Sequence, residues 1–145
     1  DAKLAIGKKL GADVLVNMDR EDLKEAVMRE TGGHGADVVL DTTGSGDLIS
    51  LSIALTRSSG HIVFPGFYER LLDDFAIDNV IIRNITLIGS AAAVDMQRQI
   101  LDLLGQGHIN LKPMITDRYP FANVKEAFAA VKEKNDTRVK ILVDF

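Results

Sequence analysis

The sequence predicts an α/β fold in which helices flank a parallel sheet. Segments with apolar residues at helical spacing alternate with short apolar runs, and only a few residues connect one segment to the next. The run Val38-Val39-Leu40 is continuously apolar, which is expected of a strand buried on both faces. Strands joined through helices in this way form βαβ units, so the strands should run parallel.

The first half of the chain shows the alternation most clearly. Glycines at positions 11, 32 and 33 can adopt positive φ and so end a helix sharply. The expected order is a helix at 2–10, a strand at 13–17, a helix at 21–30, a strand at 36–41, a helix at 47–57 capped by Asp47, and a strand at 61–65.

The pattern changes in the second half. Residues 71–78 are predicted as a loop or short strand, and residues 80–88 are strongly β-prone. Asn123 should cap a late helix, with Glu126 three residues later completing a capping box. The remaining expected elements are a helix at 94–104, an extended connection at 113–121 and a closing strand at 138–145.

Composition limits the class of protein. The chain has 145 residues, 46% of them apolar and 26% charged, which is typical of a globular domain. A net charge of −4 gives no reason to expect nucleic acid or an anionic membrane as a partner. There is no cysteine, no apolar run of bilayer length and no signal-like leader, so a cytoplasmic protein fits best. The helical pattern begins at once after Asp1, as expected of a piece of a longer chain.

No catalytic or metal-binding residue can be assigned. The three histidines, at positions 34, 61 and 108, each lie next to a glycine at an element boundary, and none has metal-ligand spacing to another. No serine lies in a G-x-S-x-G turn. The G-x-G-x-x-G fingerprint is missing, and Gly33-x-Gly35 precedes a strand rather than following one.

Small residues follow three of the predicted strands. They lie at 42–44, at 65–67 and at 87–90. Ligands of open α/β sheets bind outside the carboxyl ends of the strands, so these tips could line a flat cleft for a nicotinamide ring. The competing interpretation is that the glycines only turn the chain, and spacing alone does not separate the two.

The order of these segments resembles the C-terminal half of the medium-chain dehydrogenases, the superfamily of zinc-dependent alcohol, polyol and threonine dehydrogenases. No single segment is diagnostic, but the likeness covers essentially the whole chain. The residues that carry it are 5–13, 31–41 with Gly44, 60–66, Asn-Ile-Thr-Leu-Ile-Gly-Ser at 84–90, Ile115-Thr116, Pro120-Phe121 ahead of Glu126-Ala127-Phe128, and 140–143.

The resemblance implies a Rossmann-like domain at residues 1–91 that binds NAD or NADP and lacks its first βα unit. Residues 92–145 would form a C-terminal return segment toward a catalytic domain outside this chain, which would also hold the zinc. The cofactor-binding residues that it implies are Lys3 at the adenosine ribose, Thr42, Thr43 and Gly44 against the cofactor, Pro65, Gly66, Phe67, Leu87 and Ile88 around the nicotinamide, and Lys140, or less favourably Arg138, at the pyrophosphate.

Two residues depart from the family pattern. Asp117 stands where many relatives have histidine after Ile-Thr, which puts in doubt any role tied to that histidine. Pro65 replaces a more usual aliphatic residue and removes one backbone donor.

Family dimers form by joining the last strand of this sheet to its two-fold mate. The resemblance therefore implies a homodimer through the stretch from Val80 to Ile88. It also implies an enzyme that transfers hydride between a small alcohol or ketone and nicotinamide, with this segment inactive alone. The alternatives are a zinc-free reductase of the quinone oxidoreductase branch and a non-catalytic nucleotide-binding or dimerisation module.

Overall fold

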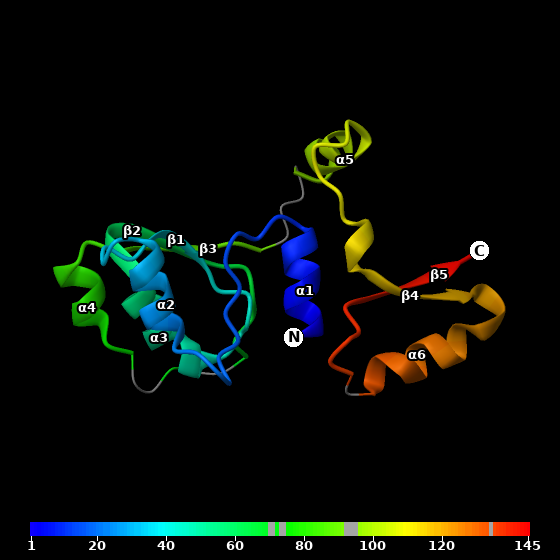
Figure 1. Cartoon of the computed structure of the whole chain (residues 1–145), viewed down its shortest axis with the longest axis horizontal. Helices are drawn as coiled ribbons and strands as arrows, with labels where there is room; N and C mark the ends of the chain where they lie inside the picture. The colour runs from blue at the N-terminus through cyan, green and yellow to red at the C-terminus, as the bar shows by residue number, and fades with distance from the viewer. Residues whose placement is uncertain (70–71, 73–74, 92–95, 134) are drawn as a thin grey trace. The chain divides into compact units, whose positions relative to one another are not determined.

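The computed structural model describes residues 1–69, 72, 75–91, 96–133 and 135–145. It divides the chain into two compact units (Figure 1). Met18–Val94 forms the sheet unit, and Asp1–Asn17 together with Asp95–Phe145 forms the terminal unit. Residues 1–17 thus group with the C-terminal residues, whereas the domains expected from sequence, 1–91 and 92–145, remain a prediction.

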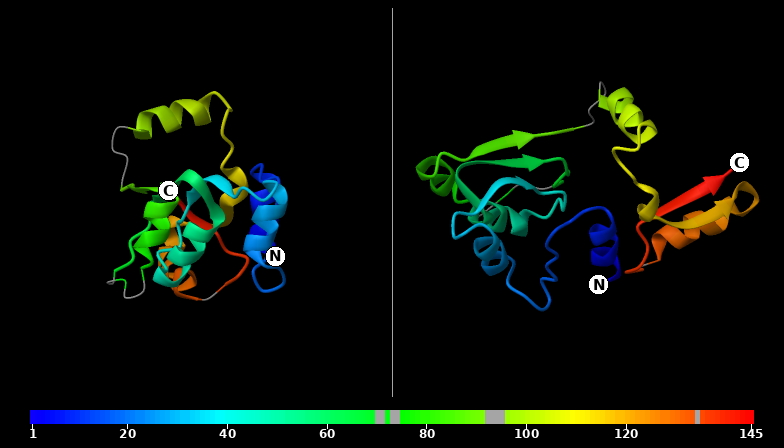
Figure 2. Two further views of the ribbon diagram at one scale, coloured as in Figure 1. Left: turned by 90° about the vertical axis from the view of Figure 1, so that its left-hand side faces the viewer. Right: turned by 45° about the horizontal axis from the view of Figure 1, so that its top comes forward.

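The sheet unit contains three parallel strands: β1 (Ala36–Leu40), β2 (Thr56–Phe64) and β3 (Thr86–Gly89). Their order is β1-β2-β3, and both neighbouring pairs are parallel. In the right-hand view of Figure 2, β2 and β3 run side by side and point the same way. The predicted parallel α/β sheet is confirmed.

Helices cover one face of this sheet. The unit contains α2 (Leu23–Glu30), η1 (Gly46–Leu48), α3 (Ile49–Leu55) and α4 (Ile77–Ile82). The buried core joins α3, β2, α4 and the residue just before β3 through Ile49, Ile53, Ile62, Val80 and Ile85. Ile62 is fully buried.

The expectation that β1 is buried on both faces is wrong for this chain. Val39 packs against the core, but Val38 and Leu40 are 54% and 66% exposed. Successive strand residues point to opposite faces, and within the described residues of this unit helices cover only the face of Val39.

The strand expected from Val80 to Ile88 is also wrong over its first part. Residues up to Ile82 form α4, a turn follows with Asn84 at φ 52°, and only Thr86–Gly89 is strand. The Ile85 N–H donates to the Val80 carbonyl at 3.0 Å, so the turn brings both side chains into one core. Burial of these two side chains outweighs the β-propensity of the run.

Two further boundaries of the sheet unit differ from expectation. Asp47 does not cap α3, because the helix is entered through η1, for which Ser45 is the N-cap residue. Strand β2 begins at Thr56, five residues before its expected start, and the Thr56 hydroxyl donates to the Ser52 carbonyl at 2.8 Å. The loop or short strand expected at 71–78 falls partly outside the described residues, at 71, 73 and 74, and it is wrong at its end, because residues 77 and 78 begin α4.

The terminal unit contains a two-stranded parallel sheet and its helices. Strands β4 (Ile115–Pro120) and β5 (Lys140–Asp144) pair in parallel, and α6 (Val124–Lys132) buries Ala127 and Ala130. The other elements are α1 (Ala2–Lys9), α5 (Gln97–Gly105), η3 (Lys112–Met114) and η4 (Phe121–Asn123).

Three expectations for this unit need correction. Residues 115–120 are a paired strand rather than a connection. Asn123 is the N-cap of α6, but its side chain makes no capping hydrogen bond, so the capping box does not form. The helix expected at 94–104 is described only from residue 96, and α5 begins at Gln97.

Residues 13–17 were expected to form a strand and do not. A strand is defined by its hydrogen bonds to a neighbour, and no neighbour pairs with this segment among the described residues. None of the helices in the described ranges has the length and apolar character needed to cross a bilayer.

Candidate functional site

The carboxyl ends of the three parallel strands lie at one edge of the sheet. The pairing places Leu40, Val63 and Ile88 in one row across the sheet. The pairing continues just beyond the ends of the strands. The Asp41 N–H donates to the Val63 carbonyl at 2.9 Å, and the Ser90 N–H donates to the Phe64 carbonyl at 3.1 Å. The segments that follow β1, β2 and β3 therefore leave the sheet side by side.

The loops after β1 and β2 approach each other backbone to backbone. Gly44 has φ +64°, and a β-carbon built on it would lie 2.6 Å from the Phe67 carbonyl oxygen. A β-carbon on Gly66 would lie 3.2 Å from the Gly44 nitrogen. Only glycine combines this φ with so close an approach, so the 42–44 loop and the 65–67 loop form one surface.

Asp41 anchors the first of these loops from beneath. Asp41 is 4% exposed. Its carboxylate accepts hydrogen bonds from the Thr43 N–H at 3.0 Å, the Thr43 hydroxyl at 2.6 Å and the Ser52 hydroxyl at 3.0 Å. Burial alone would raise the pKa of Asp41, but the hydrogen bonds from Thr43 and Ser52 outweigh burial and hold that pKa below its usual value. Asp41 is therefore a buried carboxylate that stays charged.

Tyr68 faces this carboxylate from the segment after β2. Its ring packs edge-on against Phe64 at a centroid distance of 5.9 Å. Within the described residues its buried hydroxyl has no partner at normal hydrogen-bond geometry, although it lies near enough for Asp41 to interact with it electrostatically. Burial first, and then the negative charge of Asp41, raise the pKa of Tyr68 to about 12.

The Tyr68 phenol is expected to titrate late. Its pKa in the unfolded chain is near the ordinary 10.0, so this group contributes stability that is complete below pH 10 and is lost as the pH rises toward 12. Ultraviolet titration of phenolate absorbance should show one tyrosine with an apparent pKa near 12. Tyr68→Phe should remove that step and Tyr119→Phe should not. Retention of the step in Tyr68→Phe would contradict the assignment.

Exposed side chains surround the carboxyl-end edge of the sheet. Thr42 and Pro65 are exposed, and Phe67 is 81% exposed. Leu87 and Ile88 are successive strand residues, so their side chains point to opposite faces: Leu87 lies in the row of Ile62, and Ile88 lies beyond it. The structure thus brings eight of the ten residues expected at the cofactor to one edge, but Leu87 and Ile88 do not present their side chains together.

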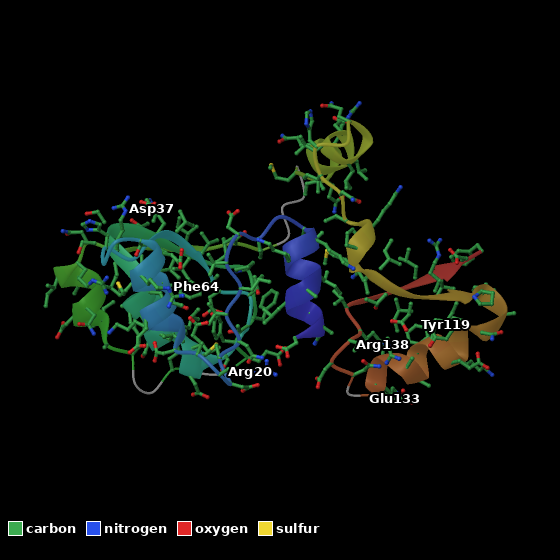
Figure 3. All side chains as sticks on the ribbon, viewed as in Figure 1. Arg20, Asp37, Phe64, Tyr119, Glu133 and Arg138 are labelled. Atoms are coloured by element: carbon green, nitrogen blue, oxygen red, sulfur yellow. The ribbon has the colours of Figure 1, made fainter. Side chains whose placement is uncertain are left out.

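Lys3 and Lys140 belong to the terminal unit. Both are exposed. Lys140 lines an open groove of about 400 Å³ beside Arg138 and Glu133. Arg138 lies beside α6 (Figure 3), where its guanidinium donates to the Ala130 carbonyl and pairs with Asp117 at 3.5 Å. Asp117 is therefore the ion-pair partner of Arg138, and Lys140 is the more accessible of the two cations.

Comparison with known proteins identifies the family. The sequence profile described as zinc-binding dehydrogenase matches residues 1–106. The chain belongs to the zinc-binding dehydrogenase family. The described residues of this chain contain no group of three His, Cys, Asp or Glu side chains that could hold a metal.

Its relatives include polyol, alcohol and threonine dehydrogenases. The chain is 37% identical to D-arabitol-phosphate dehydrogenase of Enterococcus avium over 96% of this chain and 40% of that protein. It is 28% identical to sorbitol dehydrogenase of Halalkalibacterium halodurans over 94% of this chain and 40% of that protein. The crystal structure of L-idonate 5-dehydrogenase from Escherichia coli is similar, with a TM-score of 0.85, 28% identity and coverage of 99% of this chain and 40% of that chain.

These proteins are much longer than this chain. The chain spans about 40% of the length of the relatives it matches. A crystal structure of an Escherichia coli alcohol dehydrogenase complexed with NADH has the same fold, with a TM-score of 0.88 at 21% identity over 100% of this chain and 42% of that chain.

Sequence reasoning did not select Asp41, Ser52 or Tyr68 as site residues. The one local signal is the spacing of Asp41 and Thr43, since a carboxylate often accepts from the backbone N–H two residues later. Ser52 and Tyr68 are eleven or more residues further along the chain, and only the fold brings them to Asp41. No pattern in the sequence marks them.

Proposed function

We propose that this chain is the coenzyme-binding portion of an NAD(P)-dependent, zinc-dependent dehydrogenase that acts on secondary alcohols of the polyol class. One observation carries the proposal: in a member of the zinc-binding dehydrogenase family, three parallel strands end at one edge of the sheet, where the loops after β1 and β2 meet at Gly44 and Gly66. This is the place where open α/β sheets bind their ligands.

The residues present fit a nicotinamide cofactor. Gly44 and Gly66 let two loop backbones meet without side chains between them, which leaves a shallow surface. Phe67 and Ile88 supply exposed apolar area beside that surface, and Thr42 supplies an exposed hydroxyl. A mostly apolar site with few polar groups suits a flat, weakly polar ring.

This chain would bind, orient and shield the cofactor. When bound, the nicotinamide accepts or gives the hydride. Backbone groups of the 65–67 loop and of β3 would hold the carboxamide, and the loop at Thr42 would support the ring. Pro65 has no N–H and is excluded as a donor.

Lys3 and Lys140 are proposed to neutralise the cofactor's phosphate and ribose end. Both are exposed cations. Lys140 has no anchoring interaction comparable to that of Arg138, which is bound to Ala130 and Asp117. Lys140 is therefore the better candidate for the pyrophosphate.

In the complete enzyme, the zinc would be held outside this chain. The resemblance assigns its ligands to the N-terminal half of such enzymes, and this chain has no cysteine. No step of the proposed role of this chain depends on a metal. We also propose a homodimer through the outer edge of β3, which replaces the longer strand expected from Val80 to Ile88, and a cytoplasmic location.

Cofactor binding tests the proposal. The complete product of the reading frame that contains this chain should quench or shift the fluorescence of NADH or NADPH and should oxidise a polyol such as arabitol phosphate or sorbitol. The 145-residue chain alone should be inactive. Failure of the complete protein to bind either nucleotide would overturn the proposal. Activity without bound metal would favour the zinc-free reductase instead.

A further inference from the structure

A buried carboxylate lies directly beneath the loop that the proposed cofactor site needs. Asp41 is 4% exposed and follows the last residue of β1, with Thr42–Gly44 of the loop immediately after it in the chain. Burial of an ionised carboxylate is unfavourable unless hydrogen bonds compensate it. The cluster around Asp41 provides that compensation from two separate elements.

The first element is the loop itself. The Thr43 N–H and hydroxyl both donate to one oxygen of Asp41, at 3.0 and 2.6 Å. The Thr43 hydroxyl in turn accepts from the Ser45 N–H at 3.2 Å. The first turn of the loop is thus closed on a carboxylate oxygen of Asp41, and the next turn is closed on the Thr43 hydroxyl that this oxygen holds.

The second element is α3. The Ser52 hydroxyl donates to the other Asp41 oxygen at 3.0 Å, and Ser52 is itself buried on the helix that supplies Ile49 and Ile53 to the core. Asp41 therefore connects a surface loop to a rigid helix. Hydrogen bonds to a charged acceptor are stronger than those between neutral groups, so the loop is held firmly.

We infer that Asp41 is a positioning residue of the proposed cofactor site: its carboxylate fixes the 42–44 loop against α3 in the conformation that meets the nicotinamide cofactor. The inference rests on the proposed function.

The two threonines consequently have different tasks. The only hydroxyl hydrogen of Thr43 is used in the bond to Asp41, so Thr43 has none to donate to a ligand. The side chain of Thr42 is exposed and makes no hydrogen bond within the described residues. Thr42 is thus the residue whose hydroxyl meets the cofactor, and Thr43 acts through the loop.

Conservative variants of the complete protein test this assignment. Asp41→Asn keeps the shape but replaces one acceptor oxygen by a donor, Thr43→Val removes the hydroxyl, and Ser52→Ala removes the bond from α3. Each should raise the dissociation constant for NAD(H) or NADP(H) about tenfold, as expected for a lost hydrogen bond to a charged group. Thr43→Ser should retain affinity. Ser50→Ala, an exposed serine on the same helix, should change it less than about twofold.

Amide hydrogen exchange supplies a readout that needs no cofactor. The Ser45 amide in Thr43→Val, and the Thr43 and Ser45 amides in Asp41→Asn and Ser52→Ala, should exchange about tenfold faster, while amides of β2 stay protected. A merely structural role would instead accelerate exchange across the sheet. If Asp41→Asn does not fold, the other two variants carry the same test.

The outcomes separate the inference from the proposed function. If the unsubstituted protein binds neither nucleotide, the proposed function fails and the inference with it. If nucleotide binds and the loop amides loosen without a change in affinity, the inference is wrong and the proposed function stands. Unchanged exchange at Thr43 and Ser45 would also overturn the inference.

Discussion

Gly44→Ala is expected to destabilise the sheet unit by about 3 kcal/mol and to abolish measurable cofactor binding. Two causes add. A residue with a β-carbon is strained at φ +64°, and that β-carbon would lie 2.6 Å from the Phe67 carbonyl oxygen. The neighbouring atom is backbone, so relief requires the 42–44 loop and the 65–67 loop to move apart. Hydrogen exchange of the slowest β2 amides would measure the first effect, and a titration with NADH the second.

Gly33→Ala is the matched control for this variant. Gly33 has φ +84°, but a β-carbon there would have nothing within 4 Å. It lies before the amino end of β1, away from the proposed site. We expect a loss of about 1–2 kcal/mol from backbone strain alone and unchanged affinity for the cofactor. Equal destabilisation by the two substitutions would show that the approach of the two loops has no energetic consequence.

Local sequence patterns predict much of the sheet unit, because apolar runs and turn residues mark where its strands lie. The apolar run at Val38 and the glycine turns on either side place β1 without reference to the rest of the fold. The alternation with α2 and α3 then requires parallel pairing, which the register of β1, β2 and β3 confirms. The edge at which the strand tips meet follows from parallel pairing alone, so it too was predictable.

The wrongly predicted elements have one cause in common: their structure depends on residues that are distant in the sequence. Residues 80–82 are β-prone, yet they form α4 because a helical turn lets Val80 and Ile85 share one core. Residues 13–17 are equally β-prone, yet they form no strand within the described residues, where no neighbour pairs with them. Propensity describes one segment, whereas pairing and burial depend on another.

The same limit applies to the candidate site. Thr42, Gly44 and Gly66 could be selected because they directly follow predicted strands. Asp41 could not be given its role, since the hydroxyl that ties it to the helix comes from Ser52, eleven residues later. Sequence analysis therefore located the rim of the site and missed the cluster that supports it.

Arg83→Met is expected to destabilise the sheet unit by about 2–3 kcal/mol. The Arg83 guanidinium donates to the Ile53 carbonyl at 2.9 Å and also to the Thr56 carbonyl, at the place where α3 ends and β2 begins. The Ile53 carbonyl lies in the last turn of α3, and the Thr56 carbonyl belongs to the first residue of β2. Methionine keeps much of the apolar stem but supplies no donor, so both carbonyls lose a charged partner in a partly buried environment.

Arg29→Met is the control that makes this result informative. Arg29 has two carboxylate partners, Glu21 at 3.0 Å and Glu30 at 3.2 Å, but its side chain is 58% exposed. Exposed ion pairs contribute little, so the expected loss is below about 1 kcal/mol. Exchange of the slowest β2 amides measures both variants on one scale. A larger loss for Arg29 than for Arg83 would mean that counting ion pairs predicts stability here better than burial of the donor does.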